Sequence, residues 1–258
     1  MSGKLNISFN IEKFEDFLLK MEDLSKIGDV IKIKIDTENI FMYSIVGETV
    51  LLALKSYLLK TDEYISFKEK DIEDISTIDI ISINSKKLIK NLFFIKSSPK
   101  IQMELSYKKN DDKIQIRSAQ FKGEKIKLAI QCGEESEIRD ITKKTLADRI
   151  DLKGSKWSFK VTSSKFQDIR KLASINSEGK ILYINVDNNK ILISENSIWE
   201  LEIGEVEYSN KQVIFNKSFL SSIDSDSDDV EFNMFDSFIL TKGIDSNLII
   251  SIETSFED

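Results

Sequence analysis

The sequence predicts an α+β protein made of four consecutive β-α-β-β-β repeats. Four junctions share one pattern, in which an apolar strand is followed by a small polar break and then by the apolar face of a helix. They read ISFNIEKFEDFL, ISINSKKLIKNL, FKVTSSKFQDIRKL and VIFNKSFLSSI. Repetition at an interval of roughly fifty residues is typical of proteins that place equivalent units side by side. Strand–helix junctions also arise by chance in α+β proteins, which is the alternative explanation.

The third repeat, Lys156–Gly204, shows the pattern most clearly. Alternation of Trp157, Phe159 and Val161 indicates a half-buried strand. Thr162 can accept a hydrogen bond from an amide of the first helical turn, so it is the expected N-cap. The helix presents one apolar face, formed by Phe166, Ile169, Leu172 and Ala173. Three strands are expected after it, at Ile181–Val186, Ile191–Ser194 and Ser197–Ile203, with a turn at Asp187–Asn189 between the first two.

The other repeats follow the same order. The first, Leu5–Phe67, has its helix at about Glu12 to Leu24. The second, Ile75–Gln131, is expected to have a helix at Ser85–Phe93, with Ser85 as its cap, and strands at Lys100–Tyr107, Lys113–Gln120 and Glu124–Ile130. The fourth, Glu205–Asp258, is expected to have a helix capped by Asn216 and strands at Asp229–Phe235, Ser237–Lys242 and Leu248–Thr254.

The segment Cys132–Ser155 interrupts the repeats. It is dense in charge and has widely spaced apolar residues. We therefore expect domains at residues 1–131 and 156–258, with residues 132–155 as a connector in which Thr145–Ile150 forms a helical turn. A plain solvated linker is the alternative, as opposed to a connector that also helps to build a binding surface.

Composition argues against most enzyme classes. The 258 residues include no His and one Cys, Cys132, which excludes His-based catalysis, His-ligated metals, thiolate zinc sites and an internal disulfide. No phosphate-binding glycine motif occurs. Asp224, Asp226 and Asp228 alternate like the start of a calcium loop, but the required Gly and the closing Glu are missing. We expect no cofactor, no metal and no enzymatic activity. The lone Cys, and the lack of a signal peptide or membrane-length apolar run, favour the cytoplasm.

At this point the chain resembles the DNA polymerase sliding clamps, the family of the proliferating cell nuclear antigen and the clamps of large tailed phages. The resemblance covers essentially the whole chain. It rests on the four repeats arranged two and two, the charged connector, the third-repeat pattern WSFKVTSSKFQDIRKLAS…GKILYINVDNNKILIS and the ending DSNLIISIETSFED. The short helices and the lack of His and near-lack of Pro favour the phage branch, and hence a phage-infected bacterial cell.

The resemblance implies a homotrimeric ring that encircles double-stranded DNA without reading its sequence and tethers the DNA polymerase for processive synthesis. Sheets would form the outside and helices would line the hole. The net charge of −7 is compatible with this if a modest positive lining lies within an acidic body. The basic residues on or beside the helix faces opposite the core are the candidate DNA contacts: Lys13, Lys20, Lys86, Lys87, Lys90, Lys165, Arg170, Lys171 and Lys217. The first helix is mixed, because Asp16 and Asp23 stand among its lysines.

The resemblance also implies two protein-binding surfaces. Short peptide tails of the polymerase and of the clamp loader would enter an apolar pocket, for which the candidates are Val50, Leu52, Ile141, Leu146, Ile150, Ile252, Thr254 and Phe256. Ring closure would join exposed edge strands at Glu124–Ile130 and Lys190–Ser194, with candidate interface residues Lys125, Ile126, Lys127, Leu128, Ile130, Lys190, Ile191, Leu192 and Ile193. The alternative is that both strands lie inside their own sheets.

Two functions of other classes remain open at this stage. One is an α+β protein-interaction module that forms no ring. The other is a carboxylate-dependent or metal-dependent hydrolase, which remains possible because the chain has 44 Asp and Glu residues. Such an enzyme would need several of these acids to converge in one cleft.

Overall fold

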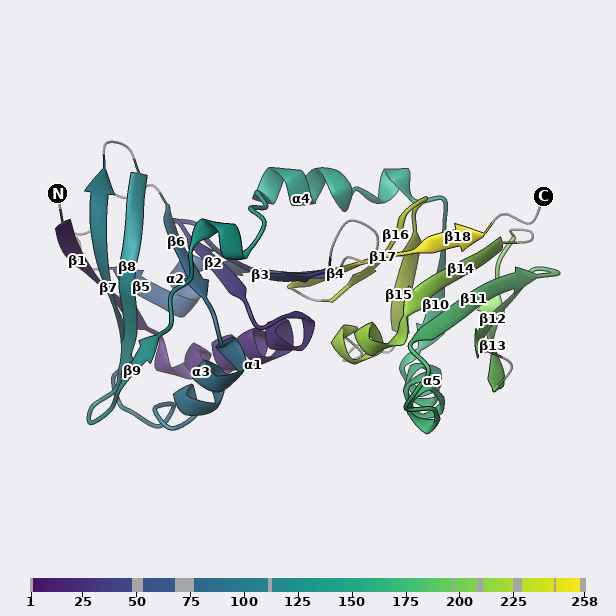
Figure 1. Cartoon of the computed structure of the whole chain (residues 1–258), viewed down its shortest axis with the longest axis horizontal. Helices are drawn as coiled ribbons and strands as arrows, with labels where there is room; N and C mark the ends of the chain where they lie inside the picture. The colour runs from purple at the N-terminus through teal and green to yellow at the C-terminus, as the bar shows by residue number, and fades with distance from the viewer. Residues whose placement is uncertain are drawn as a thin grey trace. The chain divides into compact units, whose positions relative to one another are not determined.

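The computed structural model describes residues 2–47, 53–67, 77–110, 113–196, 198–207, 211–224, 229–243 and 245–255. The chain divides into two units (Figure 1). Unit 1 comprises Met1–Ile45 and Ser56–Asp140, and unit 2 comprises Val46–Lys55 and Ile141–Asp258. The connector predicted at residues 132–155 is therefore shared: its first nine residues belong to unit 1 and the rest belong to unit 2.

Unit 1 contains two β-α-β-β-β repeats. The first consists of β1 (Ser2–Phe9), α1 (Ile11–Ile27), β2 (Ile31–Ile35), β3 (Asn39–Val46) and β4 (Ala53–Lys60), the last of which begins in unit 2. The second consists of β6 (Ile78–Ser82), α3 (Ser85–Leu92), β7 (Gln102–Asn110), β8 (Lys113–Lys122) and β9 (Lys127–Ile130). Between them lie the short α2 (Thr61–Tyr64) and β5 (Ile65–Phe67). One sheet has the order β5-β1-β7-β8-β9, and a second layer has the order β4-β3-β2-β6.

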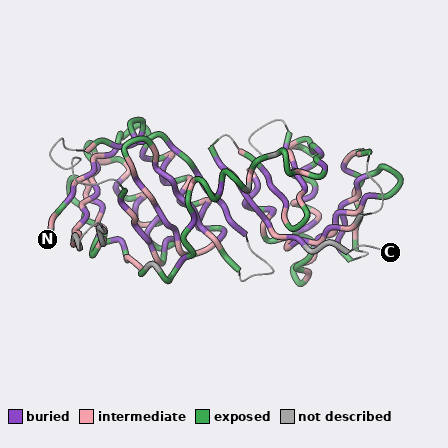
Figure 2. Tube along the Cα trace, turned by 90° about the horizontal axis from the view of Figure 1, so that it is seen from above, coloured by how far each residue is buried: buried purple, intermediate pink, exposed green. Residues whose placement is uncertain are grey.

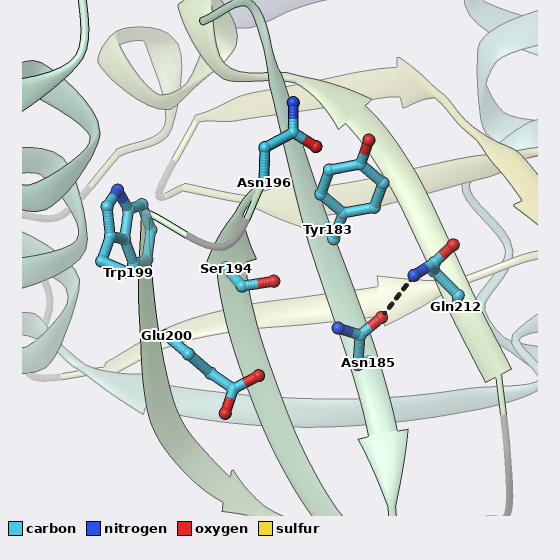
Figure 3. Close-up of a pocket in the computed structure, with 7 residues that line it drawn as sticks. All are labelled: Tyr183, Asn185, Ser194, Asn196, Trp199, Glu200 and Gln212. Atoms are coloured by element: carbon cyan, nitrogen blue, oxygen red, sulfur yellow. Dashed lines mark hydrogen bonds between the residues drawn. The ribbon is translucent and has the colours of Figure 1, made fainter.

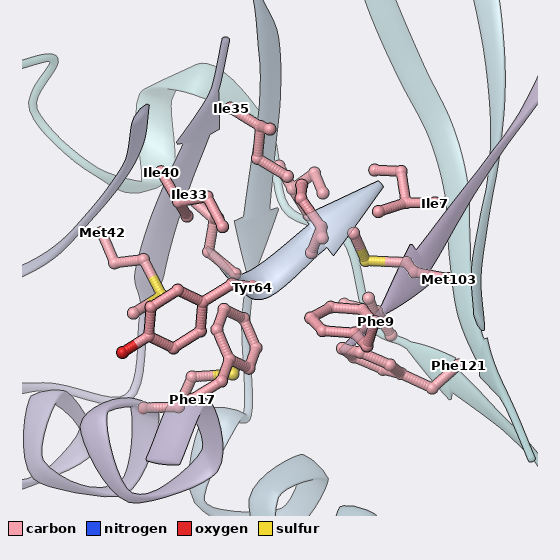
Figure 4. Packing of buried hydrophobic residues seen from close by; sticks show 14 of the residues in the cluster. Ile7, Phe9, Phe17, Ile33, Ile35, Ile40, Met42, Tyr64, Met103 and Phe121 are labelled. Atoms are coloured by element: carbon pink, nitrogen blue, oxygen red, sulfur yellow. The ribbon is translucent and has the colours of Figure 1, made fainter. Parts of the chain in front are cut away.

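The core of unit 1 is packed with large apolar side chains (Figure 4). Helix α1 buries Phe14, Phe17, Leu18, Met21 and Leu24, which recur at helical spacing. The ring of Phe9 on β1 lies 5.2 Å from that of Phe14 and 5.5 Å from that of Phe121 on β8. Aromatic rings at such separations add to the free energy gained by burial, so α1 is held firmly against the sheet.

Unit 2 contains the third and fourth repeats. The third consists of β10 (Trp157–Thr162), α5 (Ser163–Ile175), β11 (Ile181–Asp187), β12 (Lys190–Glu195) and β13 (Trp199–Glu205). The fourth consists of β14 (Lys211–Asn216), η4 (Lys217–Ser222), β15 (Asp229–Met234), β16 (Phe238–Lys242) and β17 (Ser246–Ser251). One sheet has the order β13-β12-β11-β14-β18, where β18 is Glu253–Ser255, and the other layer runs β10-β15-β16-β17. Figure 2 shows buried positions concentrated along the strands of each unit.

The predicted α+β class and the order of elements in the repeats are confirmed. Thr162 caps α5, since its side chain accepts the amide of Lys165 at 3.4 Å, and Asn216 caps η4 by accepting the amide of Ser218 at 3.0 Å. The turn between β11 and β12 places Asn188 and Asn189 at positive φ, as a tight hairpin requires.

Three local predictions are wrong. The fourth helix is a 3₁₀ helix of six residues. Ser85 is the first residue of α3 and not its cap, because its hydroxyl bonds back to Ser82; the residue at the cap position, Asn84, has a φ of 53° and its side chain caps nothing. Asp29 instead receives the amides of Ser85 and Lys86 at 3.1 and 3.2 Å. The last predicted strand is divided into β17 and β18, and β18 pairs with β14.

Candidate functional site

Helix α3 presents a basic face. Lys86, Lys87 and Lys90 are exposed, while Leu88 and Leu92 are buried on the opposite side. None of these three lysines forms an ion pair within the described residues, and α3 itself contains no acidic residue. Their positive charge is therefore available to a phosphate backbone.

Helix α1 presents a mixed face. Lys13 is exposed, and its ammonium lies 5.8 Å from the centre of the Tyr64 ring. Lys20 is only 14% exposed and pairs with Asp16 at 2.8 Å. Burial alone would raise the pKa of Asp16, but hydrogen bonds from Lys20 and Tyr64 outweigh burial and hold the pKa below its usual value. Asp16 thus stays ionised and offsets the charge of Lys20.

Helix α5 divides its basic residues between solvent and the protein interior. Lys165 is exposed, and Lys171 forms a solvent-exposed pair with Asp168 at 3.3 Å, which a phosphate can displace at small cost. Arg170 donates to the carbonyls of Leu220 and Ile223 at 3.1 and 2.5 Å. These two bonds join α5 to the end of η4, so Arg170 has a structural role.

Lys217, the first residue of η4, also bonds within unit 2. Its ammonium donates to the carbonyls of Ala173 and Asn176 at the C-terminal end of α5. It also pairs with Glu195 at 2.7 Å, and the Glu195 side chain is fully buried. The remaining donors to Glu195 are Asn176 and the Trp199 indole, each at 3.1 Å. Lys217 therefore caps α5 and neutralises a buried carboxylate, and α3 has no equivalent of this arrangement.

The first part of the connector is anchored on unit 1 by charge. Lys32 and Lys34 of β2 each lie 2.6 Å from Asp140, and the Tyr43 hydroxyl donates to the carbonyl of Arg139. Burial alone would raise the pKa of Asp140, but bonds and charge from Lys32 and Lys34 outweigh it and lower the pKa to about 2. The anchor is therefore fully charged at neutral pH.

The apolar pocket candidates that the structure describes belong to unit 2. Ile141, Leu146 and Ile252 are buried, and Ile150 at the end of α4 (Lys143–Arg149) is half-buried. Thr254 lies in β18, and nothing is described of its side chain. Val50, Leu52 and Phe256 fall outside the described residues. The structure tests none of these as peptide contacts, and the assignment stays a prediction.

A polar hollow of about 550 Å³ lies on the sheet of unit 2, on the face that carries Tyr183 and Asn185 (Figure 3). Its lining is Tyr183, Asn185, Ser194, Asn196, Trp199, Glu200 and Gln212. The Gln212 amide donates to Asn185 at 3.0 Å, across directly paired positions of β14 and β11. Amides and hydroxyls predominate in this lining, and it contains no Lys, Arg, His or Cys, so it can offer hydrogen bonds but no activated nucleophile. The sequence pattern predicted no such hollow, although polar residues at the outward positions of two strands were a readable signal.

The two predicted edge strands differ. β9 is the terminal strand of its sheet and pairs with β8 alone among the described strands; Lys125, Ile126 and Lys127 are exposed, Leu128 is half-buried and Ile130 is buried. β12 is not an edge strand, because it pairs with β11 on one side and with β13 on the other, and its Ile191 and Ile193 are buried. The edge prediction is therefore wrong for Lys190–Ser194. The terminal strand of that sheet is β13.

Within the described part of the chain, no group of three or more acidic or Cys side chains is placed to hold a metal ion. No described helix has the length and hydropathy needed to cross a bilayer.

Comparison with known proteins identifies structures with a similar fold. Protein-family models and curated sequences gave no match. The proliferating cell nuclear antigen of Entamoeba histolytica is similar to this chain with a TM-score of 0.60 at 17% identity, over 98% of this chain and 99% of that one. The β chain of DNA polymerase III from Streptococcus pneumoniae gives 0.61 at 12% identity, over 98% of this chain but 66% of that one, just under two thirds of its length. A Helicobacter pylori β clamp bound to a DNA ligase peptide gives 0.59 at 12% identity, over 99% of this chain and 68% of that one. The protein therefore has the fold of the DNA sliding clamps.

Proposed function

We propose that this protein is a sliding clamp, a non-enzymatic ring that encircles duplex DNA and tethers a DNA polymerase during processive synthesis. The observation that carries the proposal is the presence of four β-α-β-β-β repeats in a chain that matches a proliferating cell nuclear antigen over nearly the full length of both. Because that similarity concerns the fold, the functional argument also needs the charges of the helices and the edges of the sheets.

The helix faces support DNA encirclement. The three lysines of α3, together with Lys13, Lys165 and Lys171, form the set that is available to phosphates. The chain as a whole has a net charge of −7. A weakly basic lining within an acidic body attracts DNA without gripping one position, which a protein that slides requires. Lys20, Arg170 and Lys217 make internal bonds, and we leave these three out of the proposed contacts.

Partner binding is proposed for the connector and the C-terminal part of unit 2. A short apolar peptide tail, of the polymerase or of a clamp loader, would bind beside the connector residues Ile141, Leu146 and Ile150. The Helicobacter β clamp bound to a DNA ligase peptide is a precedent for peptide capture on this fold. The charged anchor at Asp140 would fix the start of the connector while such a peptide binds.

Ring closure is proposed to use three copies joined head to tail. The similarity spans 99% of a nuclear antigen chain and 66% of a β chain, which supports two clamp domains in the chain. Their bounds, residues 1–131 and 156–258, are those predicted from the sequence. A ring that closes by rotation needs two different edges on each copy, and β9 and β13 supply them. Action in a phage-infected bacterial cytoplasm stays a prediction from the sequence.

Retention on DNA tests this function. The protein is incubated with nicked circular DNA, the salt concentration is raised to screen phosphate contacts, and the bound fraction is measured by gel filtration before and after the circle is cut once. A clamp stays on the circle at high salt and is lost on linearisation. Equal loss from circular and linear DNA contradicts encirclement and favours a non-ring interaction module. Cleavage of the DNA by the protein in the presence of divalent metal would instead favour a hydrolase.

A further inference from the structure

The polar hollow on the sheet of unit 2 has no role in the function proposed above. Buried residues flank Tyr183 and Asn185 along β11, so these two side chains lie on the face of the sheet that points away from the core. Ser194 on β12 is directly opposite Tyr183, and Gln212 on β14 is directly opposite Asn185. We call these four residues the polar centre of the hollow (Figure 3).

Two hydroxyls of the polar centre have no partner in the protein. Ser194 is only 8% exposed, and its hydroxyl forms no hydrogen bond within the described residues. The hydroxyl of the half-buried Tyr183 likewise forms none with the part of the chain that the structure describes. Because most buried polar groups in native proteins are hydrogen-bonded, hydroxyls that line an open hollow without a partner are groups that a ligand can satisfy.

The side-chain amide of Asn185 is held in one orientation. The Gln212 amide donates to Oδ1 of Asn185 at 3.0 Å, and this bond fixes which end of the Asn185 amide is the oxygen. The Nδ2 group of Asn185 is therefore left as a donor that has no partner among the described residues. The polar centre thus offers an oriented N–H donor beside two hydroxyls, each of which can donate or accept.

The polar centre carries no charge. The ionised residue of the lining is Glu200, which is exposed at the rim on β13, directly opposite Ser194. The lining has no cation that would bind a phosphate or a carboxylate. A guanidinium or ammonium group has donors only, so it cannot use the donor that Asn185 presents. The ligand that fits is neutral, with groups that both donate and accept hydrogen bonds.

Bonds on the opposite side of the strands hold one end of the hollow in place. The Trp199 indole donates to Glu195 at 3.1 Å, and Lys217 pairs with the same carboxylate at 2.7 Å. Trp199 and Glu195 are paired positions at the end of the β12–β13 hairpin, whose turn contains Asn196 at a φ of 39°. A rigid sheet and an anchored turn keep the polar groups in position before a ligand arrives, which lowers the entropic cost of binding.

We propose that the polar hollow binds a neutral sugar unit, either a free monosaccharide or the end of an oligosaccharide chain. Each sugar hydroxyl supplies both a donor and an acceptor, as the polar centre requires, and the Tyr183 ring offers apolar surface to the C–H groups of the sugar. A volume of about 550 Å³ lies in the range of small-molecule sites. The lining has a single carboxylate, whereas glycoside hydrolysis typically uses two, so the sugar is bound and not cleaved.

This inference goes beyond the proposed function. The polar centre lies on β11, β12 and β14, which the proposed ring closure does not use. Sugar binding would therefore be a separate recognition function on a surface that neither DNA encirclement nor closure of the ring requires.

Saturation-transfer NMR on the full chain tests the site. The neutral probes are methyl α-D-glucopyranoside, methyl β-D-galactopyranoside, N-acetyl-D-glucosamine and the oligosaccharide maltotriose, and the charged probes are L-arginine amide and inorganic phosphate. The variants N185A, Y183F and S194A each remove one polar group from the hollow. The matched control is N247A, because Asn247 is also a half-buried amide on a strand, β17, but lies outside the lining. Circular dichroism and urea unfolding check that each variant folds.

We expect at least one neutral sugar to bind the native chain, and each of the three hollow variants to bind it about 10-fold more weakly, because each loses one hydrogen bond to the ligand. N247A should bind as the native chain does. S194A should unfold at the same urea concentration as the native chain, since its hydroxyl has no protein partner to lose. Saturation confined to the terminal ring of maltotriose would identify a chain end as the ligand, and tighter binding of a methyl glycoside would identify a free monosaccharide.

Three results would overturn the inference. The first is a lack of saturation transfer to every neutral sugar. The second is binding that N185A, Y183F and S194A leave as strong as N247A does, which would place the sugar elsewhere on the chain. The third is stronger saturation of L-arginine amide than of any sugar, which would make the ligand a cation. None of these results bears on the clamp, because the hollow variants should be retained on circular DNA as the native chain is.

Discussion

The second and fourth repeats have the same order of elements but use their helices differently. In both, an Asn directly precedes a short helix, Asn84 before Ser85–Leu92 in one and Asn216 before Lys217–Ser222 in the other. Helix α3 turns its apolar residues inward and exposes three lysines. In η4, the lysine instead bonds to the C-terminal carbonyls of α5 and to the buried Glu195.

This difference shows that equivalent positions in a repeat need not have equivalent roles. The two turns of α3 separate a buried stripe from a solvated one. The six-residue η4 packs beside the end of α5, where unpaired carbonyls attract a cation. The basic lining of the proposed ring therefore depends on α3 and parts of α1 and α5, while the fourth repeat contributes stability.

Among these predictions, the largest change in stability should follow replacement of Lys217. Replacing it in K217M leaves the Glu195 carboxylate buried without a cation, and the free energy of unfolding should fall by about 3–5 kcal/mol. The matched change in α3, K87M, removes a solvated charge and should cost less than about 0.5 kcal/mol. Urea unfolding followed by circular dichroism measures both.

A double variant tests whether the unpaired Glu195 carboxylate causes the loss of stability in K217M. Adding E195Q to K217M removes the unpaired charge and should recover part of the lost stability. If K217M and K87M are equally stable, the internal role of Lys217 is refuted.

The next effect concerns DNA affinity. The variant K86A/K87A/K90A should lower the slope of log affinity against log salt by up to about 3, since each phosphate contact contributes roughly 0.9. Its stability should change little, because all three side chains are exposed. The control K100A/K153A/K180A has the same change in net charge but lies outside α1, α3 and α5. Fluorescence anisotropy on a short duplex measures the slope. An equal decrease of the slope in both triple variants would show that DNA affinity depends only on net charge.

The smallest effects concern the helix caps. T162A removes the acceptor of the Lys165 amide and should cost about 1 kcal/mol of unfolding free energy. N84G should cost about 0.5 kcal/mol or less, because the Asn84 side chain caps nothing and glycine suits a φ of 53°. Thermal unfolding of the two variants side by side makes the measurement; a greater loss in N84G would contradict this account of the caps.

Local patterns explain what the sequence could predict. Alternation along β10, the cap at Thr162 and the apolar face of α5 depend on neighbours within a few residues, and all three are present. The roles of Arg170 and Lys217 depend on η4 lying against α5, a contact between segments about fifty residues apart. On a helix wheel, both look like ordinary solvated charges.

The order of strands within each sheet could not be predicted from the sequence either. Alternation with lysines is the same for a terminal strand and for an internal one, so Lys190–Ser194 was predicted to be an edge. The pairing of β11 with β14, and of β12 with β13, is set by tertiary packing. The β13 edge could have been noticed from its three glutamates, which suit an exposed strand.

Electron microscopy of the native protein at low salt tests the central claim most directly, namely that copies of this chain meet end to end and enclose a duplex-sized opening. The account predicts closed rings of three copies, with α1, α3 and α5 facing the opening. Single particles the size of one chain at every concentration, or open filaments built from the same contacts, would contradict it.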